Sequence, residues 1–254
     1  MLRHRVIPCL LLRDGGLVKT RRFARPKYVG DPINAIRIFN DKEADELIVL
    51  DITASRERRE PNYALIEQFA GECFMPLCYG GGIRTIDQAR RLFALGVEKV
   101  CVQTAALEDS TLVTRLAESF GAQAVLVSID VKQNWLGSRK LYAAATGKCL
   151  RRPWLEQLHL LVAAGAGEVV LNAVDRDGMM EGMDLDLIQE ASRAVSVPLI
   201  ALGGVGSVVH IKEAIAAGAS AVAAGAFFVF QGPHRAVLIT YPRPEDVASL
   251  LSAQ

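Results

Sequence analysis

Residues 79–84 read YGGGIR and residues 202–207 read LGGVGS, and the first glycines of the two runs are 123 residues apart. Two further pairs of residues recur at offsets of 124 and 123: Asp51 with Asp175, and Thr104 with Phe227. Chemical landmarks that return at one period are typical of a repeated structural unit. The sequence therefore predicts a chain of two similar halves, with the second half beginning near residue 120.

Eight short apolar runs alternate with segments of helical periodicity along the chain. The runs cover residues 5–12, 46–52, 75–81, 98–104, 122–130, 167–174, 197–204 and 219–227. Such alternation predicts an α/β fold, a single (β/α)8 TIM barrel over residues 1–254, with half-barrels at about 1–120 and 121–254. A doubly wound open sheet is the alternative, and the internal repeat favours the barrel. The segment 131–152 is expected to be a loop inserted after the fifth strand.

The composition of the 254 residues, 51% hydrophobic but only 6% aromatic, fits a buried parallel sheet covered by helices. Net charge gives no reason to expect a nucleic acid or a membrane as partner, because 29 basic and 28 acidic residues nearly cancel. Five cysteines without a CxxC spacing predict reduced thiols. The N-terminal apolar run is too short for a signal peptide, and no later run approaches the ~20 residues of a membrane span. We expect a cytoplasmic protein.

The glycine clusters follow the third and seventh apolar runs, at the end of the strands where barrels of this kind carry their sites. Small residues close the next runs, Thr104-Ala105 in the first half and Gly225-Ala226 in the second. Glycine turns and helix N-termini expose backbone N–H groups that bind phosphate. For a single glycine cluster, the alternative interpretation is that the glycines only permit a tight turn. Because the arrangement occurs twice, we expect a ligand with a phosphate at each end.

Asp130 closes the run SID at the predicted end of the fifth strand. A carboxylate there faces the barrel mouth, which favours a general acid or base over a capping residue. For three other aspartates at strand ends, a turn or capping role is as good an interpretation as a functional one: Asp51, Asp175 and Asp177.

Five basic residues gather in the segment after the first run: Lys19, Arg21, Arg22, Arg25 and Lys27. This cluster is consistent with a solvated charge run, and also with a flexible lid that closes on an anionic substrate, which Lys19 would contact. The four histidines are scattered and have no metal-ligand spacing, so we expect no bound metal and no cofactor.

The motifs together are specific: PCLLLRDGGLVK, GDP, DELIVLDITAS, YGGGIRT, GEVVLNAVDRDG and ALGGVG. Over nearly the whole chain they resemble the cyclase subunit of imidazole glycerol phosphate synthase. The resemblance implies a barrel of two half-barrels and an enzyme, a cyclase or lyase type of synthase subunit. It also implies a glutaminase partner that supplies ammonia, which the barrel adds to a bis-phosphorylated ribulosyl intermediate.

Carried over by resemblance, the two phosphate sites consist of Gly82, Gln103 and Thr104, and of Asp177, Gly178, Gly204, Gly225 and Ala226. The family has asparagine where this chain has Gln103, and serine at the positions of Cys101 and Leu202. Its acid and base are two aspartates, of which Asp130 matches the second while Leu11 occupies the place of the first. Leucine can neither give nor take a proton, so ordinary cyclisation should be severely impaired.

At the opposite, N-terminal face, the resemblance implies an ammonia gate of four charged residues: Arg5, Glu46, Lys99 and Glu168. Two positive and two negative side chains can satisfy one another around a pore. A purely structural ring is the alternative, since this face of a barrel generally supports stability. The glutaminase is expected to bind this face and form a heterodimer with the chain.

Residues 26–40 and 227–242 resemble a paralogous branch of the family, found with bacterial surface-polysaccharide genes. In that branch a glutaminase, this barrel and a separate amidotransferase are implicated in making acetamidino sugars. The favoured function is therefore the use or delivery of ammonia for amidination of a nucleotide-linked sugar in O-antigen or similar lipopolysaccharide synthesis. Two alternatives stay open: the ordinary cyclase of histidine biosynthesis, and a non-catalytic ammonia conduit that joins a glutaminase to a third protein.

Overall fold

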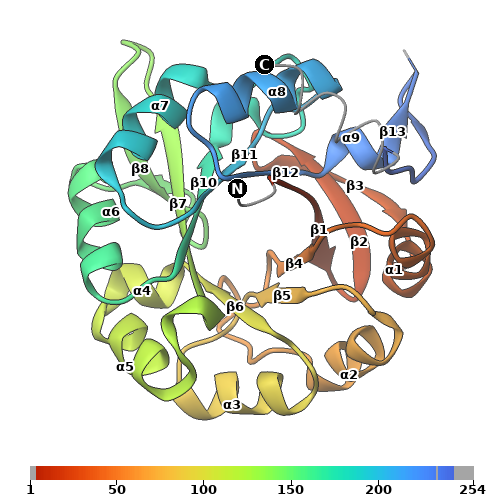
Figure 1. The fold of residues 1–254 in the computed structure, drawn as a ribbon, viewed down its shortest axis with the longest axis horizontal. Helices are drawn as coiled ribbons and strands as arrows, with labels where there is room; N and C mark the ends of the chain where they lie inside the picture. The colour runs from red at the N-terminus through yellow and green to blue at the C-terminus, as the bar shows by residue number, and fades with distance from the viewer. Residues whose placement is uncertain (1–3, 233, 243–254) are drawn as a thin grey trace.

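The fold is a closed barrel of parallel strands inside a ring of helices, seen along the barrel axis in Figure 1. The computed structural model describes residues 4–232 and 234–242. Pro233 of the segment 227–242 and the end of the second predicted half-barrel, 243–254, lie outside the described residues.

Eight parallel strands form the barrel: β1 (Arg5–Arg13), β4 (Leu47–Asp51), β5 (Leu77–Gly80), β6 (Lys99–Val102), β7 (Val125–Gln133), β10 (Glu168–Ala173), β11 (Leu199–Leu202) and β12 (Ala221–Ala224). Each begins in one of the eight apolar runs, because a strand buried on both faces reads as a continuous apolar stretch, and β1 and β7 extend beyond the end of theirs. The barrel closes where β1 pairs with β12, with Val6 beside Val222. The single (β/α)8 barrel is confirmed, and the open-sheet alternative is wrong.

Nine α-helices are described: α1 (Pro32–Asp41), α2 (Tyr63–Glu72), α3 (Ile86–Ala94), α4 (Thr104–Glu108), α5 (Thr111–Phe120), α6 (Trp154–Ala163), α7 (Leu185–Ala194), α8 (Val208–Ala216) and α9 (Ala226–Val229). Two 3₁₀ turns, Ala122–Ala124 and Val174–Arg176, complete the helical elements of the described residues. Polar side chains start several helices; Thr85 and Gln88 form a reciprocal cap at α3, which fixes the turn after Gly82.

Two segments that we expected to be loops contain strands. β2 (Gly16–Arg21) and β3 (Ala24–Gly30) form a hairpin on β1, so four of the five basic residues lie on strands rather than on a flexible loop, and Arg22 lies in the turn between them. The predicted insertion 131–152 lengthens β7 and adds β8 (Arg139–Ala143) and β9 (Lys148–Cys149). A last short pair, β13 (Phe230–Gln231) and β14 (Ala236–Val237), follows α9.

The apolar side chains form two separate clusters. The larger one lies between the strands and the surrounding helices. The smaller one fills the barrel interior with residues from Ile7 and Ile48 to Cys101 and Leu202. Among the helices of the described residues, none combines the length and apolar character needed to cross a membrane.

Candidate functional site

A cavity of about 490 Å³ opens at the C-terminal end of the barrel strands. Most of the residues that we singled out from the sequence line it: Leu11, Lys19, Gln103, Thr104, Asp130, Asp177, Gly178, Gly204, Gly225 and Ala226. Gly82 is not among the lining residues; its N–H donates to the Ser55 hydroxyl at 3.2 Å, while its neighbour Gly81 does line the cavity. The fold therefore gathers the candidate site from both halves of the chain.

Two short helices begin at this cavity with no side chain capping them. Gln103 precedes α4 and Gly225 precedes α9, and neither provides a capping hydrogen bond. The first N–H groups of a helix need partners from outside the helix, and they favour anions. The two helices occupy equivalent places in the two halves, since Thr104 and Phe227 are one repeat apart. The cavity thus presents two sites at which a phosphate can accept backbone hydrogen bonds.

Asp130 lies inside the cavity with only 4% of its surface exposed. Burial raises the pKa of its carboxyl to about 7, although the Gln103 side chain and the Ser128 hydroxyl, which donates to Oδ1 at 3.0 Å, act in the opposite direction. A carboxyl that titrates near neutral pH can both give and take a proton there. The geometry is consistent with the acid or base role predicted for Asp130.

The wall across the barrel from Asp130 is apolar at the position where the resemblance led us to look for a second carboxylate. Leu11 pairs in register with Leu50 of β4, and both line the cavity together with Cys101 and Leu202. Asp14 does not replace the missing group, because its side chain is 72% exposed and it is absent from the residues lining this cavity. This side of the site can pack against an apolar group but cannot transfer protons.

Asn172 is a residue of the cavity that sequence reasoning missed. It pairs in register with Asp130, from β10 to β7, and only 7% of the residue is exposed. Its Oδ1 has no hydrogen-bond partner among the described residues. A buried polar atom without a partner costs free energy, and a polar group of a ligand bound in the cavity would remove this cost. Only its place at a strand end could have drawn attention to it.

The β2–β3 hairpin covers one side of the cavity. Asp177 Oδ2 accepts hydrogen bonds from the Thr20 hydroxyl at 2.6 Å and from the Phe23 N–H at 3.1 Å. Burial raises the pKa of Asp177, while Thr20, the Phe23 N–H and Lys19 oppose the rise. The ring of Phe23 meets Tyr142 of β8 edge to face, with centroids 5.8 Å apart. In this structure the hairpin is therefore closed on the barrel.

Lys19 differs from its exposed neighbours on the hairpin. Only 4% of it is exposed, and its Nζ donates to the Cys9 carbonyl at 2.5 Å. Burial lowers the pKa of its amine, against the influence of Cys9 and Asp177. The interpretation as part of a solvated charge run is wrong for Lys19, because strand pairing turns it into the cavity; its contact with an anion stays a prediction.

Two aspartates at strand ends have structural partners. Asp51 Oδ1 accepts hydrogen bonds from the N–H groups of Thr53 and Ala54, which is a capping role. Asp175 Oδ2 accepts from the Gln133 N–H at 2.7 Å and so holds the end of β7 next to the hairpin turn. The turn and capping interpretation agrees with the geometry of Asp51, whereas Asp175 links two elements that are distant in the sequence.

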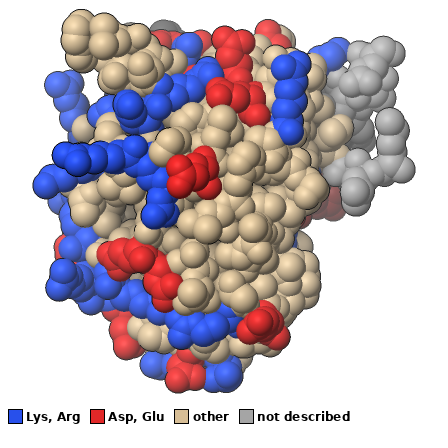
Figure 2. Space-filling view, turned by 90° about the vertical axis from the view of Figure 1, so that its left-hand side faces the viewer, with Lys and Arg blue, Asp and Glu red and all other residues tan. Residues whose placement is uncertain are grey.

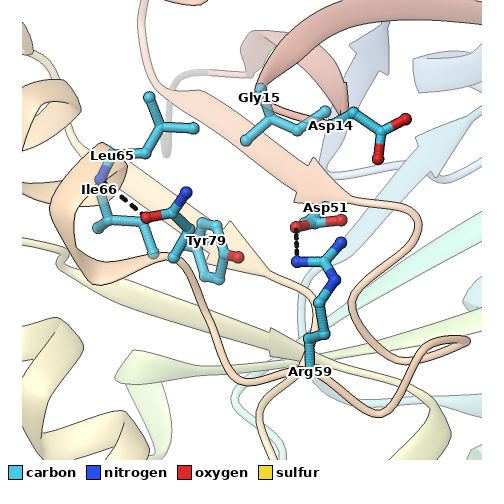
Figure 3. Close-up of a pocket in the computed structure, with 9 residues that line it drawn as sticks. Asp14, Gly15, Asp51, Arg59, Leu65, Ile66 and Tyr79 are labelled. Carbon is cyan, nitrogen blue, oxygen red and sulfur yellow. Dashed lines mark hydrogen bonds and ion pairs between the residues drawn. The ribbon is translucent and has the colours of Figure 1, made fainter.

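A second, smaller cavity of about 160 Å³ lies between α2 and the ends of β1, β4 and β5. Figure 3 shows the Asp51–Arg59 ion pair, 3.8 Å between Oδ2 and Nη1, beside the Tyr79 hydroxyl and across from Asp14. Leu65 and Ile66 are among its apolar walls, and Asn62 adds a polar one. The predicted site residues lie in the larger cavity, and we assign the chemistry there.

At the opposite end of the barrel the four charged residues form a closed ring. Arg5 Nη1 lies 2.5 Å from Glu46 and its Nη2 lies 2.9 Å from Glu168. Lys99 Nζ completes the ring at 2.9 Å from Glu46 and 3.2 Å from Glu168. Burial would lower the pKa of Arg5, but the two carboxylates raise it above its ordinary value. Each cation thus contacts both anions, as the sequence led us to expect of a self-satisfying ring.

Three thiols lie in the barrel interior, Cys9, Cys78 and Cys101, and the first and last of them also line the cavity. Burial raises the pKa of Cys9 to about 11 and that of Cys78 and Cys101 well above the ordinary value. They therefore stay protonated near neutral pH, and the interior carries no charge between the two ends. All five cysteines are free, Cys149 on the surface. Within residues 4–232 and 234–242, His, Cys, Asp and Glu side chains form no group suited to hold a metal ion.

The sequence of this chain matches one protein family and several known proteins. The model of the family described as "Histidine biosynthesis protein" matches residues 5–233. The chain is 54% identical over 243 residues to a Pseudomonas aeruginosa protein named "Putative imidazole glycerol phosphate synthase subunit hisF2", with 95% of this chain and 97% of the relative covered. It is 40% identical over 213 residues to "Imidazole glycerol phosphate synthase subunit HisF" of Streptococcus sanguinis, with 84% of each chain covered.

Proposed function

The chain belongs to the histidine biosynthesis protein family as a HisF-like member, and from this premise we propose the following function. It is the synthase-type barrel subunit of a glutamine amidotransferase and receives ammonia from a glutaminase bound at the N-terminal face. It uses or delivers this ammonia for amidination of a phosphorylated or nucleotide-linked sugar in O-antigen or other surface-polysaccharide synthesis, with a separate amidotransferase as a further partner. The cytoplasm is the proposed location, where the five free thiols stay reduced.

One observation carries this proposal: the cavity has two uncapped helix N-termini and a buried Asp130, but leucine at position 11. The helix N-termini suit a ligand with two phosphates, in agreement with the predicted sites. Asp130 can serve as a proton donor or acceptor near neutral pH. Leu11 can be neither a proton donor nor a proton acceptor. A reaction that needs two carboxylates is therefore disfavoured, and a transfer of ammonia that needs one acid or base is favoured.

The other end of the molecule supports the entry of ammonia. The ring of Arg5, Glu46, Lys99 and Glu168 surrounds the barrel axis at the face opposite to the cavity. Beyond it the interior is apolar, with protonated thiols. Transfer of an ion into such surroundings is costly, so neutral ammonia passes in preference to ammonium.

The test is ammonia-dependent turnover of the family's bis-phosphorylated ribulosyl substrate by the purified chain and by Leu11→Asp. Excess ammonia removes the need for a glutaminase, so the barrel's own chemistry is measured. We expect no turnover by the wild-type chain and recovered turnover by the variant. A wild-type rate of roughly 1 per second or more, which is ordinary for enzymes, would establish the histidine-pathway cyclase instead. The name of the streptococcal relative favours that second candidate.

The non-catalytic conduit is tested by Asp130→Asn in the complete system of glutaminase, barrel and sugar acceptor. Asparagine keeps the shape of the side chain but cannot transfer the proton. If Asp130 is catalytic, sugar amidination falls at least about 100-fold, the usual contribution of a general acid or base. An unchanged rate of sugar amidination would show that the barrel acts only as a conduit for ammonia and as a scaffold.

A further inference from the structure

The smaller cavity, of about 160 Å³, is lined by none of the residues to which the proposed function assigns a role. A cavity needs only about 10 to 15 Å³ to hold one water molecule, so this one has room for a small organic molecule. On the side of the molecule that Figure 2 shows, Lys and Arg are interspersed with Asp and Glu. A surface of mixed sign does not select a charged macromolecule, so the cavity is the better candidate for a further binding site.

Two buried polar atoms face this cavity without a hydrogen-bond partner among the described residues. Tyr79 is 1% exposed, and its hydroxyl points toward the Asp51–Arg59 pair (Figure 3). Asp51 uses its Oδ1 to cap the turn after β4, whereas its Oδ2 lies 3.8 Å from Arg59 Nη1, which is beyond hydrogen-bond distance. A ligand that bonds to both atoms would remove the free-energy cost of leaving them unpaired.

Two further side chains have donor atoms left for a ligand. Asn62 Oδ1 caps α2 by accepting from the Leu65 N–H at 3.2 Å, while its Nδ2 forms no hydrogen bond with the described residues. Arg59 uses Nε for Glu57 and Nη2 for the Thr53 hydroxyl, at 2.5 and 3.0 Å, which leaves Nη1. The cavity therefore combines hydrogen-bond donors with one acceptor carboxylate.

The charges around the cavity favour a neutral ligand. Asp51 and the exposed Asp14 would repel an anion, and the Arg59 guanidinium would repel a cation. Burial raises the pKa of Tyr79, and Asp51 acts in the same direction, so the hydroxyl stays protonated near neutral pH. A hydroxyl of a ligand can donate to Asp51 Oδ2 and accept from Tyr79 at once, because it is both a donor and an acceptor.

Another part of the cavity wall is apolar and consists of Leu12, Leu65 and Ile66. The C–H groups of a ligand gain free energy when they leave water and pack against such a wall. A wholly apolar ligand, however, would leave Asp51 Oδ2 and the Tyr79 hydroxyl unpaired in a dry site. A sugar ring carries hydroxyl groups and C–H groups side by side, so it suits both kinds of wall.

We propose that the cavity between α2 and the ends of β1, β4 and β5 binds a neutral sugar ring, with one hydroxyl bonded to Asp51 Oδ2 and Tyr79 and another accepting from Asn62 Nδ2. This inference goes beyond the proposed function, because Tyr79 and Asn62 do not line the large cavity and the site needs no reaction there. Asp51 lines both cavities, so the bound sugar lies beside the larger one.

The experiment is a titration of the full chain with D-glucose, followed through the amide chemical shifts in ¹H–¹⁵N NMR spectra. We expect saturable shifts in the segments that line the small cavity, namely residues 12–15, 51–54 and 62–66. These shifts give the Kd of the site. Shifts confined to residues 103–106 and 225–228 would place the glucose in the large cavity and overturn the proposal.

Three variants test the contacts. Tyr79→Phe removes only the unpartnered hydroxyl and should weaken glucose binding by about three- to tenfold, the usual value of one hydrogen bond. Asn62→Asp keeps the cap of α2 but replaces the Nδ2 donor by an acceptor, and should weaken binding by about the same factor or more. Tyr28→Phe is the matched control, at an exposed tyrosine that lines neither cavity, and should leave the Kd unchanged. The thermal unfolding of each variant is compared with that of the wild type.

Matched probes test the class of ligand. D-Glucuronate adds a carboxylate, D-glucosamine adds an ammonium group, and cyclohexanol keeps a ring with a single hydroxyl; each should bind more weakly than glucose. The proposal is rejected if glucose causes no shift at the small cavity, if Tyr79→Phe has the Kd of the wild type, or if one of these probes binds there more tightly. Because neither ammonia nor glutaminase is present, this result is independent of the turnover test of the proposed function, and either can fail alone.

Discussion

Asp130 makes folding sensitive to pH, because its carboxyl has a pKa of about 7 in the folded chain and an ordinary value of 3.8 when solvated. The folded state therefore holds a proton that the unfolded state releases, so stability is greatest below pH 4 as far as this group is concerned, and falls as the pH rises to 7. A shift of this size corresponds to roughly 4 kcal/mol in total. We predict that Asp130→Asn removes most of this fall in the free energy of unfolding, measured by urea denaturation between pH 4 and 8.

Asp177 contributes to the same slope, since burial also raises its pKa, so a part of the fall remains in the variant. Asp14→Asn is the control, because Asp14 is exposed in a turn with a φ of 53° that asparagine adopts readily. An equal slope in wild type and Asp130→Asn would show that Asp130 is solvated.

Asn172 has the burial of a core residue, but its Oδ1 has no hydrogen-bond partner among the described residues. If its carboxamide exists for a ligand, the free chain gains nothing from it, and an apolar side chain of similar shape should fit at least as well. We predict that Asn172→Leu leaves the free energy of unfolding unchanged or raises it by about 1 kcal/mol, while turnover or amidination falls at least tenfold. Urea unfolding without ligand measures the first part. A loss of 2 kcal/mol or more would make Asn172 a structural residue.

The β2–β3 hairpin shows how an element is held closed by a few contacts. Thr20, Phe23 and Tyr142 connect it to the barrel, and Arg22, Phe23 and Arg25 adopt positive φ values of 53°, 60° and 50° near its tip. For residues other than glycine such backbone is strained, so closure depends on these contacts. The hairpin should therefore open more easily than the barrel strands.

We predict that Thr20→Val, which removes the hydroxyl that bonds to Asp177, speeds amide hydrogen exchange in residues 16–30 by about five- to tenfold. Exchange in β5 and β10 should not change, because the barrel does not depend on this bond. Mass spectrometry of peptides from the two regions measures both. Arg21→Ala, at an exposed residue of the same strand, is the matched control. Equal exchange in all three proteins would mean that the Thr20 bond does not hold the hairpin.

The sequence predicts the barrel strands but not the β2–β3 hairpin, because the two are stabilised in different ways. The barrel strands could be predicted because both faces are buried, so that β11 reads LIAL without a polar residue. The β2–β3 hairpin could not, since β3 reads ARPKYVG and is mostly exposed. Its strands form because β1 supplies hydrogen bonds, and the burial of Lys19 depends on the Cys9 carbonyl. Such contacts between distant residues leave no local pattern.

For the molecule as a whole, the repeat of 123 residues predicted where the two ends of the site lie. Gly80 is the last residue of β5 and Gly203 follows β11, and α4 and α9 begin at Thr104 and Ala226, an offset of 122 residues. We propose that the half-barrels at about 1–120 and 121–254 are the units of this repeat. Leu11 could be identified only by resemblance, and Asn172 only by seeing that its Oδ1 lacks a partner. Sequence patterns predict positions on strands, whereas the hydrogen bonds of a side chain depend on the assembled barrel.

The charged ring joins four strand ends and tests whether the N-terminal face is built for stability or for passage. Glu46 is 2% exposed and contacts both Arg5 and Lys99, so removing one cation leaves a buried carboxylate partly unpaired. We predict that Lys99→Met lowers the free energy of unfolding by about 2 to 3 kcal/mol, and that adding Glu46→Gln recovers part of this loss. A double-mutant cycle in urea measures the coupling, with Arg37→Met, at an exposed pair with Glu72, as the control that should change little. If Lys99→Met is as stable as the wild type, the ring is not retained for stability, and its retention would favour a gate that must open.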